Sequence, residues 1–143
     1  MISQTEAYAL RAMTCLAFRF PEFMTRDQLS QAAEVPHAYL PKIMLELNRT
    51  GLIRSQRGQN GGYALIPTPQ EISLLDVIKS VKAGSPREQY QWNAASSSEV
   101  QQLDQHLNHT FSLLETSLEQ TSLADIFNIS NRPSTEVPDC VQQ

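Results

Sequence analysis

The sequence has little of what builds covalent frameworks, membrane spans or export signals. Its 143 residues include only 2 cysteines, and Cys15 and Cys140 lie too far apart for the disulfide framework of a small secreted domain. No apolar run approaches the roughly 20 residues that span a bilayer. The N-terminus has no basic segment followed by an apolar one, so we expect no secretory signal. These absences favour a cytoplasmic protein with no membrane association, made of one small domain and an appended element.

Signatures of catalysis are missing as well. No Ser/His/Asp or Cys/His arrangement stands at a recognisable spacing. The glycine-rich segment 56–62 lacks the Gly-Lys-Ser/Thr of a nucleotide-binding loop, and it joins two predicted strands rather than a strand and a helix. We therefore expect neither enzyme activity nor a bound cofactor.

The net charge of −4 hides an uneven distribution along the chain. Residues 1–82 carry nine Lys and Arg against seven Asp and Glu, whereas residues 83–143 carry two against eight. The first part therefore has a charge of +2 and the second a charge of −6. Because affinity for phosphate depends on the local surface, a chain that is acidic overall can still present a basic face to DNA.

Apolar residues at helical spacing predict two helices in the first part of the chain. The first covers residues 5–20 and ends before Pro21, which cannot continue a helix. Thr25 and Gln28 stand at the spacing of a capping box and predict a short second helix over residues 26–34.

A third helix and a β-hairpin are predicted next. Pro41 is tolerated only in the first turn of a helix, which places the helix start near His37, and Gly51 ends the helix. Residues 52–55 and 63–66 then read as short strands, joined by a loop that contains three glycines and an asparagine. Three helices followed by a hairpin with a long loop are the order of a winged helix-turn-helix domain. We therefore predict a mainly α fold with a small β-hairpin wing.

The rest of the chain predicts a short helix, a loop and an extended arm. Residues 72–78 form a short helix, capped by its serine, that completes the winged domain over residues 1–82. Residues 83–98 have no periodicity and are predicted as a loop. Residues 99–129 hold a long dimerisation helix and a short terminal helix, and residues 130–143 are predicted as a disordered tail.

The long helix carries an apolar stripe that needs a surface to cover it. Successive apolar residues are three or four positions apart, so they share one face, and the flanking residues are Gln, Asn and Glu. We favour the same helix of a second subunit as the cover, which makes the chain a homodimer, over packing on the chain's own head. The stripe consists of Val100, Leu103, Leu107, Phe111, Leu114 and Leu118.

Several of these segments share a pattern with one known family. They are residues 8–13, the pair Tyr39-Leu40 followed by Leu47, the glycine-rich run 51–63, and the later segments 71–78 and 122–126. Together they resemble the Rrf2 family of bacterial transcription regulators, which includes the IscR, NsrR and CymR proteins. The resemblance extends over about residues 1–82 and 98–127.

The resemblance implies a dimeric winged-helix regulator, a repressor in our interpretation, that binds double-stranded DNA at a pseudo-palindromic operator. The third helix would enter the major groove, and Arg57 in the wing would reach the minor groove, where the negative potential attracts arginine. Backbone amides of the wing glycines, Gly62 included, would approach phosphates. The predicted DNA-binding residues are Gln28, His37, Ala38, Tyr39, Lys42, Arg54, Arg57, Gly58, Gln59, Asn60 and Gly61.

The sequence departs from the family at the metal centre. Many members hold an iron–sulfur cluster on three cysteines between the short helix after the wing and the long helix. The corresponding segment here, residues 83–98, contains no cysteine, and thiolates are the normal ligands of such clusters. We therefore expect no cysteine-ligated cluster. His106 and His109 could pair on one helix face, and Glu6 and Asp104 could contribute further ligands, but a solvated helix surface is the simpler interpretation.

Other functions stay open at the level of sequence. One is a winged-helix module that docks another protein and no longer binds DNA. Another is a metal or redox sensor with histidine and carboxylate ligands. The signal for a regulator would be a small-molecule effector at the dimer helices or a protein partner, and Tyr90 and Trp92 would either line an effector pocket or cover the dimer helix.

Overall fold

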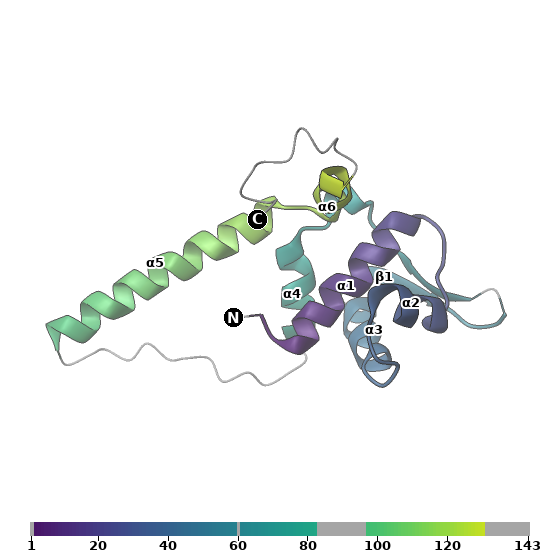
Figure 1. Cartoon of the computed structure of the whole chain (residues 1–143), viewed down its shortest axis with the longest axis horizontal. Helices are drawn as coiled ribbons and strands as arrows, with labels where there is room; N and C mark the ends of the chain where they lie inside the picture. Colours follow the sequence, from purple (N-terminus) through teal and green to yellow (C-terminus); the bar gives the residue numbers. More distant parts are fainter. Residues whose placement is uncertain (1, 60, 83–96, 131–143) are drawn as a thin grey trace.

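A helical head, a two-stranded wing and one long projecting helix make up the molecule (Figure 1). The computed structural model describes residues 2–59, 61–82 and 97–130. The elements are α1 (Gln4–Arg19), α2 (Arg26–Ala33), α3 (Leu40–Arg49), β1 (Ile53–Gln56), β2 (Gly62–Leu65), the 3-10 helix η1 (Pro69–Glu71), α4 (Leu74–Lys82), α5 (Ser98–Gln120) and α6 (Leu123–Ser130). The predicted fold class, a mainly helical winged helix-turn-helix with a long C-terminal helix, is confirmed.

Side-chain caps fix the starts of the first two helices. Ser3 Oγ accepts a hydrogen bond from the Glu6 N–H, and the Glu6 carboxylate accepts one from the Ser3 N–H. The predicted capping box of Thr25 and Gln28 is present: Thr25 Oγ1 accepts from the Gln28 N–H at 3.1 Å, and Gln28 Oε1 accepts from the Thr25 N–H at 3.0 Å. Each box satisfies donors that a helix start would otherwise leave unpaired.

The predicted start of the third helix near His37 is wrong. The helix begins at Leu40, with Pro41 as its second residue, and the preceding residues form a turn in which the Tyr39 N–H donates to the Pro36 carbonyl at 3.0 Å. A helix that began at His37 would need the N–H of residue 41 for its ladder, and proline has none. Pro41 is therefore compatible with the later start, where its missing N–H leaves no gap in the helix.

The wing is a two-stranded antiparallel hairpin tethered to the loop before α2. The strands lie one residue later and one residue earlier than predicted, with Ile53 opposite Leu65 in the register. Met24 and Tyr63 exchange two backbone hydrogen bonds of 2.9 and 2.8 Å, which fasten the wing to the head. Gly62 has a φ of +142°, and a Cβ there would overlap the Met24 carbonyl oxygen, so this tether requires glycine.

The core lies around α1, which packs against α2, α3, α4, α6 and the wing strand β2. Leu123 of α6 is fully buried, and its N–H donates to the Ile72 carbonyl, while the Leu74 N–H donates to the Thr121 carbonyl. The chain thus returns from α5 to the head through these two backbone bonds. The sequence did not predict η1, which turns the chain between wing and α4. The largest fully buried side chains include Met13, Leu16, Leu29, Leu47, Ile53 and Ile72.

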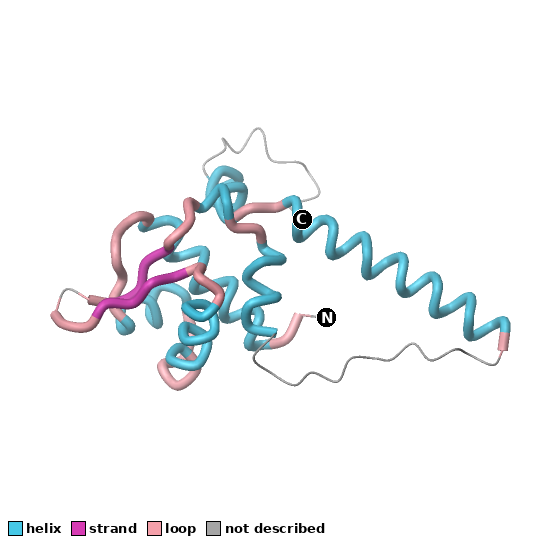
Figure 2. The backbone as a smooth tube through the Cα atoms, turned by 180° about the vertical axis from the view of Figure 1, so that it is seen from behind, coloured by secondary structure: helices cyan, strands magenta, loops and turns pink. Residues whose placement is uncertain are grey.

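Helix α5 runs outward from the head (Figures 1 and 2). None of its side chains is fully buried. It touches the head through α4, so its outer half, with Val100 and Leu103 46% and 55% exposed, lies beyond the head. It begins at Ser98, one residue earlier than predicted, with Ser97 as its N-cap. The predicted loop falls almost wholly on residues 83–96, and the predicted tail on residues 131–143, which lie outside the described residues. Among the described helices, none is long and apolar enough to span a membrane.

Candidate nucleic-acid interface

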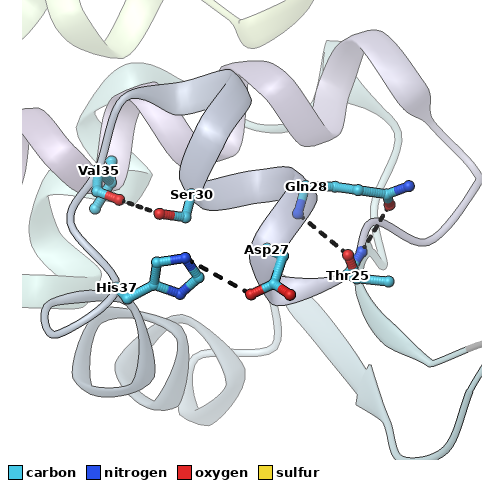
Figure 3. Close-up of polar contacts among 6 residues, drawn as sticks. All are labelled: Thr25, Asp27, Gln28, Ser30, Val35 and His37. Atoms are coloured by element: carbon cyan, nitrogen blue, oxygen red, sulfur yellow. Dashed lines mark hydrogen bonds and ion pairs between the residues drawn. The ribbon is translucent and has the colours of Figure 1, made fainter.

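Helices α2 and α3 form a helix-turn-helix whose turn is held by hydrogen bonds. Glu34 ends α2 in the left-handed conformation, at a φ of 55°. The buried Ser30 hydroxyl then donates to the Val35 carbonyl at 2.6 Å, and the Val35 N–H donates back to the Ser30 carbonyl at 3.1 Å (Figure 3). His37 Nε2 lies 3.6 Å from Asp27 Oδ1, a further link between the turn and α2 (Figure 3). These bonds fix the direction in which α3 starts.

Four predicted DNA-binding residues lie together at the start of α3. His37, Ala38 and Tyr39 are exposed in the turn, and Lys42 is exposed in the first turn of the helix. Tyr39 is the residue before α3, and 43% of its surface is accessible. In helix-turn-helix proteins the N-terminal residues of the second helix are the ones that reach base edges. In this chain those positions carry an exposed lysine and an exposed tyrosine.

Gln28 has a local role that limits what it can offer to DNA. Its Oε1 is engaged by the Thr25 N–H in the capping box, and the two donors of its amide group point away from that contact (Figure 3). Those donors remain suited to a phosphate oxygen at the N-terminus of α2.

The wing exposes Arg57, Gly58 and Gln59, whereas Asn60 lies outside the described residues. Gly61, which is predicted to contact phosphate, also has a structural role in the wing. Its N–H already donates to the Gly58 carbonyl at 3.1 Å, and a Cβ on it would overlap the Gln56 carbonyl. Gly61 therefore shapes the wing. Gly62 is likewise closely covered, by the Met24 carbonyl described above.

A concave groove of about 540 Å³ separates α3 from the wing. Arg57 and Gly58 line it from the wing, Leu45 and Asn48 line it from α3, and Arg26 lines it from the start of α2. Cations along such a groove favour a phosphate backbone.

Arg26 lines the groove, and the sequence analysis did not single it out. It directly follows the N-cap Thr25, which fixes it at the first position of α2. The capping pattern was visible in the sequence, but the closeness of α2 to the wing depends on the tether between Met24 and Tyr63. No spacing along the chain indicates that tether.

Arg54 is held by an aromatic ring at the wing base. Its guanidinium lies 4.8 Å from the centre of the Phe23 ring, a cation–π distance. Arg54 is exposed on β1, so the contact orients the charge without covering it.

The described residues do not fit a metal centre. Among residues 2–59, 61–82 and 97–130, no group of three His, Cys, Asp or Glu is placed to hold a metal ion. Cys15 is half-buried in α1, and burial raises the pKa of its thiol, whereas an iron–sulfur ligand must be a thiolate. Glu6 is buried and committed to the Ser3 cap, and His106 and His109 are exposed on α5.

Comparisons with known proteins agree with this geometry. A model of the Rrf2 family, described as iron-dependent transcriptional regulators, matches residues 2–129. The chain is 27% identical to the HTH-type transcriptional regulator IscR of Cereibacter sphaeroides over 96% of this chain and 93% of that protein. It is 33% identical to the regulator NsrR of Halalkalibacterium halodurans over 52% of each chain.

The chain is also similar to a solved structure and, over part of its length, to further curated regulators. The oxidized form of CymR from Staphylococcus aureus superimposes with a TM-score of 0.71 at 27% identity, over 88% of this chain and 94% of that one. The chain spans about half the length of other curated relatives, 57% of an rrf2-like regulator of Rhodobacter capsulatus and 55% of an HTH-type regulator of Aquifex aeolicus.

Proposed function

Because the chain belongs to the Rrf2 family of transcriptional regulators, we propose that it is a homodimeric repressor that binds a pseudo-palindromic operator without an iron–sulfur cluster. As a DNA-binding regulator, and not an enzyme, it would act in the cytoplasm. The observation that carries the proposal is the groove between α3 and the wing, which Arg57 lines from the wing and Arg26 lines from the start of α2.

The DNA contacts divide between the two grooves of the duplex. The start of α3, with Tyr39 and Lys42, enters the major groove, where lysine can pair with a guanine edge or a phosphate. Arg57 extends from the wing into the minor groove, where a narrow groove strengthens the negative potential. Arg26 and Arg54 contact the backbone between these sites and add affinity without reading sequence.

The exposed face of α5 supports the dimer. Its 23 residues carry six apolar side chains on one face, and none of the six is fully buried by the head. A second copy of α5, crossing the first, would cover this stripe and the adjoining hollow of about 280 Å³ between α4 and α5. A two-fold dimer then presents its two α3 helices to half-sites about 34 Å apart, one turn of B-DNA.

A regulator without a cluster needs another signal. The two cysteines of the sequence cannot supply the three thiolates of the family's cluster, and Cys15 is a protonated, half-buried thiol. We therefore place regulation in a small-molecule effector or a protein partner that acts at the dimer helices.

Selection from a pool of randomised duplexes tests the proposal. The purified protein is first checked by metal analysis and visible absorbance, and the selection is run at physiological ionic strength. Enrichment of a two-fold symmetric site by colourless, metal-free protein is the expected result. No enrichment contradicts the DNA-binding role and favours a protein-docking module. Enrichment that requires added iron contradicts the cluster-free regulator.

A further inference from the structure

The outer face of α1 contacts both ends of the helix-turn-helix turn. The ring of Tyr8 meets the ring of Tyr39 edge-on, with centroids 5.2 Å apart and planes at 62°. The Tyr8 hydroxyl accepts a hydrogen bond of 2.9 Å from Gln4 Nε2, one turn earlier in α1. The Arg11 guanidinium lies 5.9 Å from the centre of the Tyr8 ring. We call Tyr8, Arg11 and Tyr39 the Tyr8 cluster.

The Tyr8 ring gives the Tyr39 side chain a contact outside its own helix. Tyr39 precedes α3 in the helical conformation, and its side chain makes no capping hydrogen bond. Edge-to-face aromatic pairs have a preferred geometry, so the Tyr8 ring restricts the rotamers that Tyr39 can adopt. An interface side chain that is already oriented loses less conformational entropy on binding.

Arg11 secures the other end of the turn. Its Nη1 donates to the Glu34 carbonyl at 3.3 Å, and Glu34 is the left-handed residue that ends α2. A cation close to the last carbonyls of a helix is favourable. The same arginine faces the Tyr8 ring, so one surface of α1 holds the end of α2 and Tyr39, the residue before α3.

We propose that Tyr8 is a positioning residue for DNA recognition, which orients Tyr39 at the start of α3 and does not itself touch DNA. The inference rests on the proposed DNA-binding function. It assigns a recognition role to α1, a helix in which the sequence analysis predicts no DNA-binding residue.

The chain provides a matched control on the same helix. Phe18 of α1 pairs with Phe127 of α6 at a centroid distance of 5.3 Å, nearly the same as in the Tyr8 pair. This second pair joins α1 to α6 instead of α3. Removing its exposed ring should lower the melting temperature but leave DNA affinity unchanged.

The test compares Tyr8→Ala, Tyr39→Ala, the double variant and Phe18→Ala by fluorescence anisotropy. The probes are a duplex carrying the site enriched above and a duplex with the same bases scrambled. Tyr8→Ala is expected to weaken binding to the enriched site about 2- to 10-fold, the value of an aromatic pair, with binding to the scrambled duplex unchanged. Tyr8→Phe, which keeps the ring, should restore the affinity.

Three further measurements distinguish a Tyr8 that positions Tyr39 from one that contacts DNA itself or only stabilises the fold. In the Tyr39→Ala background, Tyr8→Ala should have no further effect. The slope of log affinity against log salt should stay at the wild-type value, because no phosphate contact is removed. If Tyr8→Ala unfolds, Tyr8→Leu keeps the apolar volume without the aromatic edge and should show the same loss.

The inference is overturned if Tyr8→Ala binds the enriched site as tightly as wild type, or if its loss adds to that of Tyr39→Ala. Failure of the wild-type protein to enrich any site overturns the proposed function itself, so the two failures are distinguishable.

Discussion

Arg57 at the wing tip is the residue whose removal best separates DNA binding from folding. It is exposed, so Arg57→Ala should leave thermal stability nearly unchanged, while the loss of a groove contact should weaken operator binding about 10-fold or more. Anisotropy titrations and melting curves measure the two effects. Arg19→Ala, which removes an exposed arginine at the end of α1, is the control and should bind like wild type. Full affinity in Arg57→Ala would contradict the minor-groove role.

Because Gly62 has no side chain, the wing backbone can approach Met24 closely enough for the tether to the head. Gly62→Ala combines an unfavourable φ with an overlap on Met24, and should lower the free energy of unfolding by about 2 kcal/mol or more. Gly51→Ala is the matched control, because its φ of +79° is similarly unfavourable but a Cβ there meets nothing within 4 Å. Urea unfolding should therefore show a smaller loss for Gly51→Ala. Equal losses in the two variants would argue against the overlap.

Cys15 is predicted to be a slow nucleophile. Burial raises the pKa of its thiol above the ordinary value of 9.0, so the reactive thiolate is scarce at neutral pH and grows only in more alkaline solution. In a Cys140→Ser variant, the rate of alkylation should reach half its maximum above pH 9.0. A midpoint below that value would mean that Cys15 is activated and would reopen a redox role.

At the scale of elements, local patterns predicted most of the fold. Helices α1 and α2 were predicted within one residue because their apolar period and caps are written in neighbouring residues. The start of α3 was predicted too early, since Pro41 limits how far a helix can precede it but the turn at Pro36 decides where it begins.

Parts of the candidate site could not be predicted because they depend on contacts between distant segments. The Tyr8 and Tyr39 rings meet across 31 positions of sequence, and Arg26 reaches the groove only because the wing is tethered at Met24. The exposed cations at the start of α3 and in the wing, by contrast, followed from the predicted winged order and the family resemblance.

The contribution of the Thr25 cap to the stability of α2 can be measured. Thr25→Ala removes the acceptor for the Gln28 N–H and should cost about 1 kcal/mol of stability. Thr116→Ala, on exposed α5, removes only a bond from its hydroxyl to the Ser112 carbonyl and should cost less. Chemical unfolding of both variants measures the difference, and equal costs would show that α2 does not depend on its cap.

At the scale of the whole molecule, α5 decides whether the chain acts alone or as a pair. Leu103→Asp or Leu107→Asp places a charge on the apolar stripe beyond the head and should convert a dimer to a monomer of 16.1 kDa. Gln105→Asp introduces the same charge between them on the polar side and should leave the mass unchanged. Light scattering after size exclusion reads the mass directly. An unaltered mass in the leucine variants would exclude α5 as the interface.

The attachment of α5 at one end only has a geometric consequence. Its last residues are fixed to the head by the backbone bonds between 72–74 and 121–123, whereas its first turns extend beyond the head. A helix of 23 residues is about 34 Å long, close to one turn of B-DNA. In the proposed dimer the length of α5 therefore sets the distance between the two heads. Sliding the crossing point by one helical turn would shift each head by about 5 Å and put the recognition helices out of step with the duplex.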